Sequence, residues 1–85
     1  MDDETLKTYA YISISSYRVK TMKAMNDDVK IPTQIAKDTG ILPIHITKVL
    51  KELKEVKIVE CINEEARKER LYRLTSVGDE IADFE

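Results

Sequence analysis

Apolar residues recur every three or four positions through the middle of the chain, which is the spacing of one face of an α-helix. The clearest run spans residues 43–56, and its apolar stripe consists of Ile46, Val49, Leu50, Leu53 and Val56. A shorter run spans residues 32–39. Each run begins with a proline, which suits the first position of a helix because no N–H is needed there. Gly40 lies between the runs and supplies the positive φ of a tight turn. The pattern therefore predicts a helix-turn-helix over residues 32–56.

The period changes after this motif, because apolar and polar side chains begin to alternate as they do in a strand. The alternation covers residues 58–62 and again residues 71–75. The polar stretch 63–69 between them has the composition of a hairpin loop. We expect the two strands to form an antiparallel wing over residues 58–75.

The chain after the wing returns to helical spacing over residues 77–84. Ser76 is the predicted N-cap of this helix, and Asp79 takes the place of the usual glutamate or glutamine of a capping box. The predicted apolar face consists of Val77, Ile81 and Phe84.

The first part of the chain carries two patterns at once. Side chains alternate over residues 9–15, which favours an extended stretch, whereas residues 4–8 equally fit one or two helical turns. The conformation of residues 4–14 therefore stays ambiguous. A helix follows over the run SYRVKTMKAM, with Ser15 or Ser16 as its N-cap, and residues 26–28 form a loop.

The predicted order of elements is helix, helix, turn, helix, strand, loop, strand, helix. The expected fold class is therefore α+β, mainly α with a small β-hairpin. It is a winged helix-turn-helix with a three-helix core, a two-stranded wing and a short C-terminal helix. At 85 residues the chain has the size of one small domain, and we assign residues 1–85 to it.

The composition excludes several classes of protein. With 42% hydrophobic and 35% charged residues the chain is neither disordered nor built to span a membrane. Its start, MDDETLK, lacks the basic-then-apolar order of a signal peptide, so we expect a cytoplasmic protein. One cysteine, Cys61, and one histidine, His45, form no metal-binding spacing. The sequence also contains no catalytic grouping, so it predicts neither an enzyme nor a bound cofactor.

The charge is distributed unevenly along the chain. The net charge is −2 and the pI is near 5.4, unlike most domains that bind nucleic acids. Residues 74–85 hold four acidic residues and no basic one, whereas residues 30–73 hold ten basic residues against seven acidic ones. The helix-turn-helix and the wing are therefore mildly basic. Because affinity for phosphate depends on the local charge, this region stays compatible with a nucleic-acid partner.

Three stretches of the chain carry a family likeness: residues 15–18 (SSYR), 32–40 (PTQIAKDTG) and 59–78 (VECINEEARKERLYRLTSVG). In this order they resemble the winged helix-turn-helix transcriptional regulators of the MarR/ArsR-like kind, and most closely the small archaeal members. The likeness covers about residues 15–82. It implies a transcriptional regulator that binds double-stranded DNA sequence-specifically, with helix 43–56 in the major groove and the wing on the backbone.

The resemblance also implies which side chains face the DNA. Ile44 would meet a thymine methyl group, and Lys48 would donate to a guanine. The alternative is a solvated helix face on which Lys48 pairs with Glu52, and Lys51 with Glu55. The predicted DNA-binding residues are Thr33, Pro43, Ile44, His45, Thr47, Lys48, Lys51, Lys54, Arg67, Lys68 and Arg70.

Three positions depart from the family pattern. Lys57 stands where many relatives have glycine, and a lysine costs about 1 kcal/mol if that site needs a positive φ. Glu69 replaces a common glycine of the wing. Leu42 replaces the serine or threonine that usually caps the second helix of the motif, a cap worth about 1 kcal/mol.

Two further questions stay open at the level of sequence. The second candidate function is a protein-interaction module in a transcription or replication assembly, for which an exposed Ile44 and a weak basic balance are suited. RNA binding is a third. For the oligomeric state, either residues 4–14 and 77–84 form a compact homodimer contact or the chain acts as a monomer.

Overall fold

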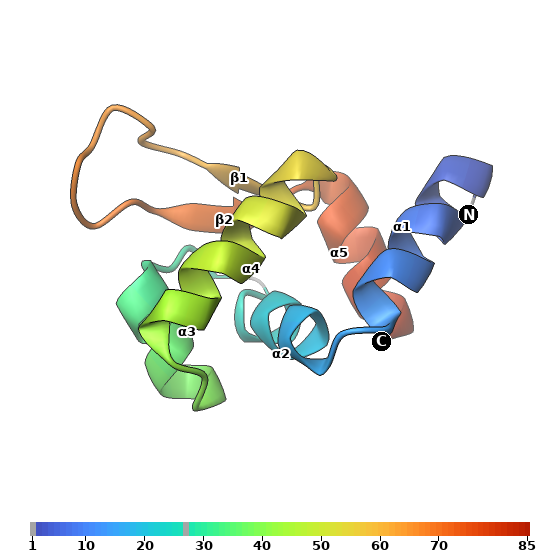
Figure 1. Ribbon diagram of the computed structural model, residues 1–85. Helices are drawn as coiled ribbons and strands as arrows, with labels where there is room; N and C mark the ends of the chain where they lie inside the picture. The colour runs from blue at the N-terminus through green and yellow to red at the C-terminus, as the bar shows by residue number, and fades with distance from the viewer. Residues whose placement is uncertain (1, 27) are drawn as a thin grey trace.

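The computed structural model describes residues 2–26 and 28–85, and within them five helices and a two-stranded antiparallel sheet form the fold (Figure 1). In chain order the elements are α1 (Asp3–Ser13), α2 (Ser16–Ala24), α3 (Pro32–Thr39), α4 (Pro43–Glu55), β1 (Val59–Cys61), β2 (Tyr72–Leu74) and α5 (Ser76–Phe84). Met1 and Asp27, which belongs to the predicted loop 26–28, lie outside the described residues. The predicted α+β class and the order of a winged helix-turn-helix are confirmed.

Helices α2, α3 and α4 pack together as the body of the fold, and the wing projects from one end of it (Figure 1). Helices α1 and α5 pack against each other at the other end. The stripe predicted for α4 is confirmed, because Ile46, Val49, Leu50 and Leu53 are all buried. Val56 is only partly buried, since the helix ends before it and it serves as the C-cap.

The N-terminal segment is helical as α1, so the extended stretch favoured by the alternation over residues 9–15 is wrong. Asp2 caps the helix, because its Oδ1 accepts a hydrogen bond from Thr5 N at 2.8 Å. The helical course places Ile12 in the core with no exposed surface. A capped start and a buried isoleucine outweigh a local alternation, which carries no information about packing against α2 and α5. Ser15 caps α2 as predicted, with its Oγ accepting from Arg18 N at 3.3 Å.

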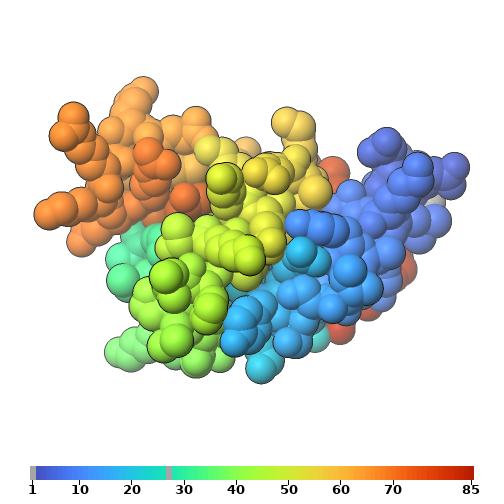
Figure 2. Space-filling model, in the orientation of Figure 1, coloured from blue at the N-terminus to red at the C-terminus, as the bar shows by residue number. Residues whose placement is uncertain are grey.

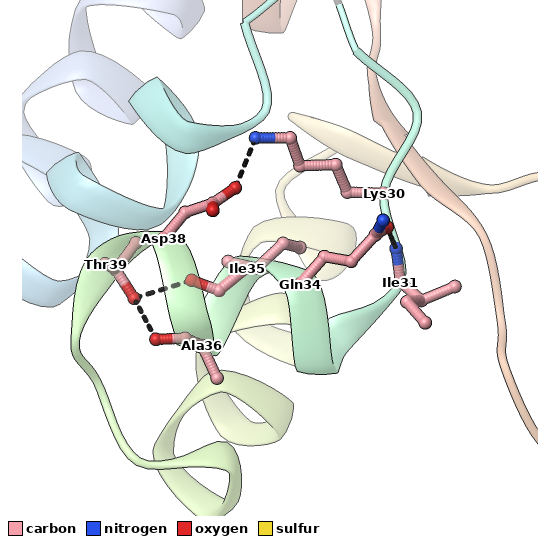
Figure 3. Close-up of polar contacts among 7 residues, drawn as sticks. All are labelled: Lys30, Ile31, Gln34, Ile35, Ala36, Asp38 and Thr39. Atoms are coloured by element: carbon pink, nitrogen blue, oxygen red, sulfur yellow. Dashed lines mark hydrogen bonds and ion pairs between the residues drawn. The ribbon is translucent and has the colours of Figure 1, made fainter.

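Side chains fix both ends of α3 and with them the turn into α4 (Figure 3). At the start, Gln34 Oε1 accepts a hydrogen bond from Ile31 N at 3.1 Å. At the end, Thr39 Oγ1 donates to Ile35 O at 2.8 Å. Gly40 follows with φ 74°, which is the left-handed conformation predicted for this turn. The left-handed Gly40 and the hydrogen bond of Thr39 therefore together set the angle between α3 and α4.

Both strands are shorter than the ranges 58–62 and 71–75 that the alternation predicts. Ile58 N donates to Leu53 O at 2.9 Å and so closes the end of α4, which leaves only the Ile58 carbonyl to pair across the hairpin, with Thr75 N. Leu71 N donates to the side chain of Asn63, at 2.7 Å from Oδ1. Local hydrogen bonds of this kind take N–H groups that would otherwise bond to the neighbouring strand. The alternation of apolar and polar residues does not reveal them.

Lys30 forms an isolated bridge with Tyr72 of β2, which no sequence pattern indicates. Lys30 N donates to Tyr72 O at 3.0 Å, and Tyr72 N donates to Lys30 O at 2.9 Å. The segment that leads into α3 is thereby tied to the base of the wing. The bridge consequently fixes the position of the wing relative to the helix-turn-helix.

Two residues other than glycine adopt the left-handed backbone conformation, Lys57 with φ 64° and Glu69 with φ 53°. Both stand where the family pattern has glycine. The condition stated for Lys57, a site that needs a positive φ, is therefore met, and each side chain costs about 1 kcal/mol in this region. Lys57 O accepts from Thr75 Oγ1 at 2.7 Å, and Glu69 O accepts from Asn63 Nδ2 at 3.4 Å.

Helix α5 differs from its prediction in its cap and in its buried face. The cap is Thr75 rather than Ser76, because Thr75 Oγ1 accepts from Gly78 N at 3.1 Å. Gly78 and Ile81 face the core, whereas Val77 and Phe84 are 39% and 62% exposed. Gly78 lacks a side chain and lets the helix approach the backbone at Ile58, which turns Val77 away from the core.

Candidate nucleic-acid interface

Helix α4, the second helix of the motif, starts as an exposed apolar end. Leu42 is its N-cap and, as expected, makes no side-chain cap hydrogen bond. Pro43 occupies the first helical position, where its missing N–H costs nothing. Leu42 is 63% exposed and Ile44 is 74% exposed. The rest of the described chain leaves both side chains uncovered.

A groove of about 550 Å³ lies between α4 and the wing. Leu50, which is buried, and Tyr72, which is partly buried, give it an apolar lining. Ile44 and Thr47 lie along the same groove. Figure 2 shows the face concerned, with the atoms of α4 in front and the wing projecting beside them. Four exposed cationic side chains complete the lining: Lys48, Lys51, Lys54 and Arg70.

One of these cations has an acidic partner on the wing. Lys54 Nζ forms an ion pair with Glu64 Oε1, and both side chains are substantially exposed. The hydrogen bond from Lys54 lowers the pKa of the Glu64 carboxyl, and the hydrogen bond to Glu64 raises the pKa of the Lys54 ammonium. Both groups are therefore charged at neutral pH, and the pair links the last turn of α4 to the wing.

Glu52 of α4 has its partner on the α2 side of the helix. Its Oε1 accepts from Arg18 Nε of α2 at 3.3 Å. The alternative pair Lys48–Glu52 is therefore not formed. Among residues 2–26 and 28–85, Lys48 and Lys51 form no ion pair, so their charge is available at the groove.

A smaller hollow of about 290 Å³ lies on the α2 side of α4, and sequence analysis missed it. The Tyr17 ring lies 5.6 Å from the His45 ring, at an angle of 46° between the planes. Lys48 lines this hollow as well as the groove. The pair joins two helices far apart in sequence, and no sequence pattern indicates it.

The structure brings together six of the predicted contact residues around the groove: Ile44, Thr47, Lys48, Lys51, Lys54 and Arg70. Of the others, His45 lies in the smaller hollow and Pro43 starts the helix. Arg67 and Lys68 are exposed on the projecting loop of the wing, and Thr33 is exposed on the first turn of α3. These residues do not line the groove.

Within the part of the chain that the structure describes, no three His, Cys, Asp or Glu side chains are grouped to hold a metal ion. None of the helices described is long and apolar enough to cross a membrane. Among the described residues, the groove beside α4 is lined by four cationic side chains and by no acidic one.

A helix-turn-helix flanked by a two-stranded wing defines the winged-helix fold, and solved structures of that fold match the chain. ZitR from Lactococcus lactis, in two structures of a double mutant, matches with TM-scores of 0.72 and 0.73 at 21% identity. The MarR family transcriptional regulator SPO1453 from Silicibacter pomeroyi DSS-3 matches with a TM-score of 0.73 at 16% identity. At these identities the likeness establishes the fold.

The matches cover 82%, 94% and 96% of this chain but 49%, 61% and 61% of the respective solved chains. The chain therefore spans about half to three-fifths of the length of these structures. No protein-family model matches the sequence, and no curated protein matches it.

Proposed function

We propose that the chain binds double-stranded DNA sequence-specifically, as part of a transcriptional regulator, with α4 in the major groove and the wing on the backbone. The cationic groove beside the exposed face of α4 carries this proposal. An α-helix about 10–12 Å across fits a major groove about 12 Å wide, and the second helix of this motif is the one that enters it. A structural neighbour named as a MarR family transcriptional regulator supports the proposal.

The proposal assigns the predicted residues to two kinds of contact. Base edges are assigned to the first turns of α4, namely Pro43, Ile44, His45, Thr47 and Lys48. The sugar-phosphate backbone is assigned to residues further along and around this face, namely Thr33, Lys51, Lys54, Arg67, Lys68 and Arg70. The net charge of −2 is compatible with DNA binding, because the excess of acidic residues lies in residues 74–85, mainly on α5.

The double variant Lys48→Ala, Lys51→Ala tests the proposal. Its affinity for a labelled duplex at low salt is expected to fall at least about tenfold, because two cations are lost from the groove. The plot of log affinity against log salt should become shallower by about 0.9, because Lys51 is assigned to a phosphate and Lys48 to a base edge. Fluorescence anisotropy over a salt series measures both.

The matched control is Lys20→Ala, Lys23→Ala, which removes the same charge from exposed positions on α2 away from the groove. It should leave the salt slope unchanged. If wild-type protein does not bind duplex DNA at low salt, or if the α4 variant keeps affinity and slope, the DNA proposal is wrong.

A second variant, Glu64→Gln, acts in the opposite direction. In the proposal Lys54 exchanges its glutamate partner for a phosphate, so removing the competing Glu64 charge should raise duplex affinity about threefold. Glu65→Gln is the matched control, because Glu65 is exposed and forms no ion pair within the described residues. Equal behaviour of the two variants would show that the ion pair does not compete with DNA.

A protein-interaction module is the second candidate function. The exposed side chains of Leu42 and Ile44 favour it, because neighbouring exposed apolar groups suit a protein partner. The salt series separates the two functions, since contact with an apolar partner releases few counterions.

A homodimer, if formed, is assigned to α1 and α5. The Phe84 ring of α5 packs edge-on against Tyr9 of α1, with centroids 6.5 Å apart, yet Phe84 stays 62% exposed. Leu6 of α1 is also half exposed. An apolar surface shared by these helices is suited to a second copy.

A further inference from the structure

The first two turns of α4 offer few hydrogen-bonding groups for reading a base. Arginine reads guanine with two hydrogen bonds, and asparagine or glutamine reads adenine in the same way. Helix α4, with the sequence PIHITKVLKELKE, contains none of these three residue types. The hydrogen-bonding side chains that these turns offer to a base are therefore those of His45, Thr47 and Lys48.

The polar side chains on these turns are His45, Thr47 and Lys48. Thr47 Oγ1 donates its proton to Pro43 O at 3.1 Å, so the hydroxyl has no second proton for a base acceptor. The His45 ring lies against Tyr17 on the α2 side of the helix. Lys48 is the charged donor left on these turns, and it recognises an acceptor as a point charge rather than in a fixed plane.

Apolar surface is what this end of α4 presents instead. Ile44 is 74% exposed at the start of the helix, and it lies on the same groove as Leu50 and Tyr72. Apolar lining therefore continues from the tip of the helix toward the wing. In the major groove the one apolar group on a base edge is the 5-methyl group of thymine.

We propose that Ile44 is the main specificity-determining residue of this chain and that it reads thymine methyl groups, so that the preferred sites are rich in A·T pairs. This inference rests on the proposed function and names its substrate class. Lys48, one turn further along, selects a neighbouring guanine acceptor. Specificity then depends on shape and methyl contact, with few direct hydrogen bonds.

The test replaces thymine by uracil, which removes the methyl group and leaves base pairing intact. Duplexes are first selected from a randomised library with the wild-type protein. The selected duplexes are then made with thymine or with uracil at each position. Wild-type affinity should fall about fourfold for each contacted thymine, the effect of losing one buried methyl group.

Ile44→Ala should bind thymine and uracil duplexes equally. Ile14→Ala is the matched control, because Ile14 is an isoleucine that is 81% exposed and follows α1 rather than lying on α4. This control should keep the wild-type preference for thymine. Comparing the thymine-to-uracil ratio, rather than affinity alone, removes any general loss of binding or folding.

The possible failures are distinguishable. If sites are enriched but uracil substitution changes nothing, the methyl readout is wrong and the DNA-binding function stands. If Ile44→Ala keeps the full thymine preference, another residue reads the methyl group and the assignment to Ile44 is overturned. If no duplex is enriched and none is bound at low salt, the proposed function itself fails, and with it this inference.

Discussion

Replacing Gly78 by alanine is expected to destabilise the fold by about 3 kcal/mol. A Cβ at this position would overlap the carbonyl oxygen of Ile58 and would lie 3.2 Å from Leu74 Cβ. The Ile58 oxygen cannot easily move, because it accepts from Thr75 N at 2.9 Å. Alanine is the better helix former by about 1 kcal/mol, but this gain is smaller than the cost of separating α5 from the backbone between α4 and β1.

Gly40→Ala is the matched control for this prediction. It has no atom within 4 Å of the added Cβ, but its φ of 74° is unfavourable for alanine. It should therefore cost only about 1 kcal/mol. Urea unfolding followed by circular dichroism compares the two variants with the wild type. Equal losses would show that α5 can shift away from Ile58 at little cost.

The helix-turn-helix was predictable because its signals are local. The stripe on α4 repeats over several turns, and periodic burial of that length leaves few alternatives. The turn depends on Gly40, whose positive φ follows from the residue type itself. Lys57 was predictable for a related reason, since the family pattern places a glycine there and the structure has φ 64°.

The contacts that hold the elements together were not predictable in this way. Lys30 and Tyr72 form a bridge of a single residue pair, which has no period. The face of α5 depends on how closely Gly78 approaches Ile58, a distance set by tertiary packing. The helix α1 was ambiguous because residues 9–15 alternate locally while Ile12 is buried by distant elements.

The candidate site likewise has features that the sequence predicts and features that depend on tertiary packing. The basic residues of α4 and the wing could be identified from the motif, because their charge and their order along the chain are properties of the sequence. That Lys54 is paired with Glu64, and that Tyr72 lines the groove, depends on how far the wing leans toward α4. Sequence therefore indicated the cations, and the structure distinguishes paired cations from unpaired ones.

Replacing Arg18 by alanine is expected to lower the free energy of unfolding by about 2–3 kcal/mol. The guanidinium joins three helices: Nη1 donates to Tyr11 O of α1 at 2.7 Å, and Nε donates to Glu52 of α4. Its Cζ also lies 3.8 Å from the centre of the Tyr11 ring. The Arg18 and Glu52 side chains are only 14% and 25% exposed, so water replaces the lost bonds incompletely.

Arg18→Lys separates charge from geometry. A lysine keeps the charge but lacks the planar fork that bonds a carbonyl and a carboxylate together, so it should recover less than half of the loss. Urea unfolding of Arg18→Ala, Glu52→Gln and the double variant completes a double-mutant cycle, with an expected coupling of about 1 kcal/mol. Purely additive losses would show that Arg18 stabilises the fold through Tyr11 alone, and a wild-type midpoint for Arg18→Ala would remove the network as a support of the fold.

The same variant links the fold to the proposed function. Glu52 lies on the helix that carries Lys48 and Lys51, and Arg18 neutralises it there. In Arg18→Ala an unpaired carboxylate is left beside the cationic face, so duplex affinity should fall further than the loss of folded protein explains. Arg18→Ala combined with Glu52→Gln removes that carboxylate charge and should restore much of the affinity while remaining less stable than wild type. If affinity instead follows stability in both variants, Arg18 acts only through the fold.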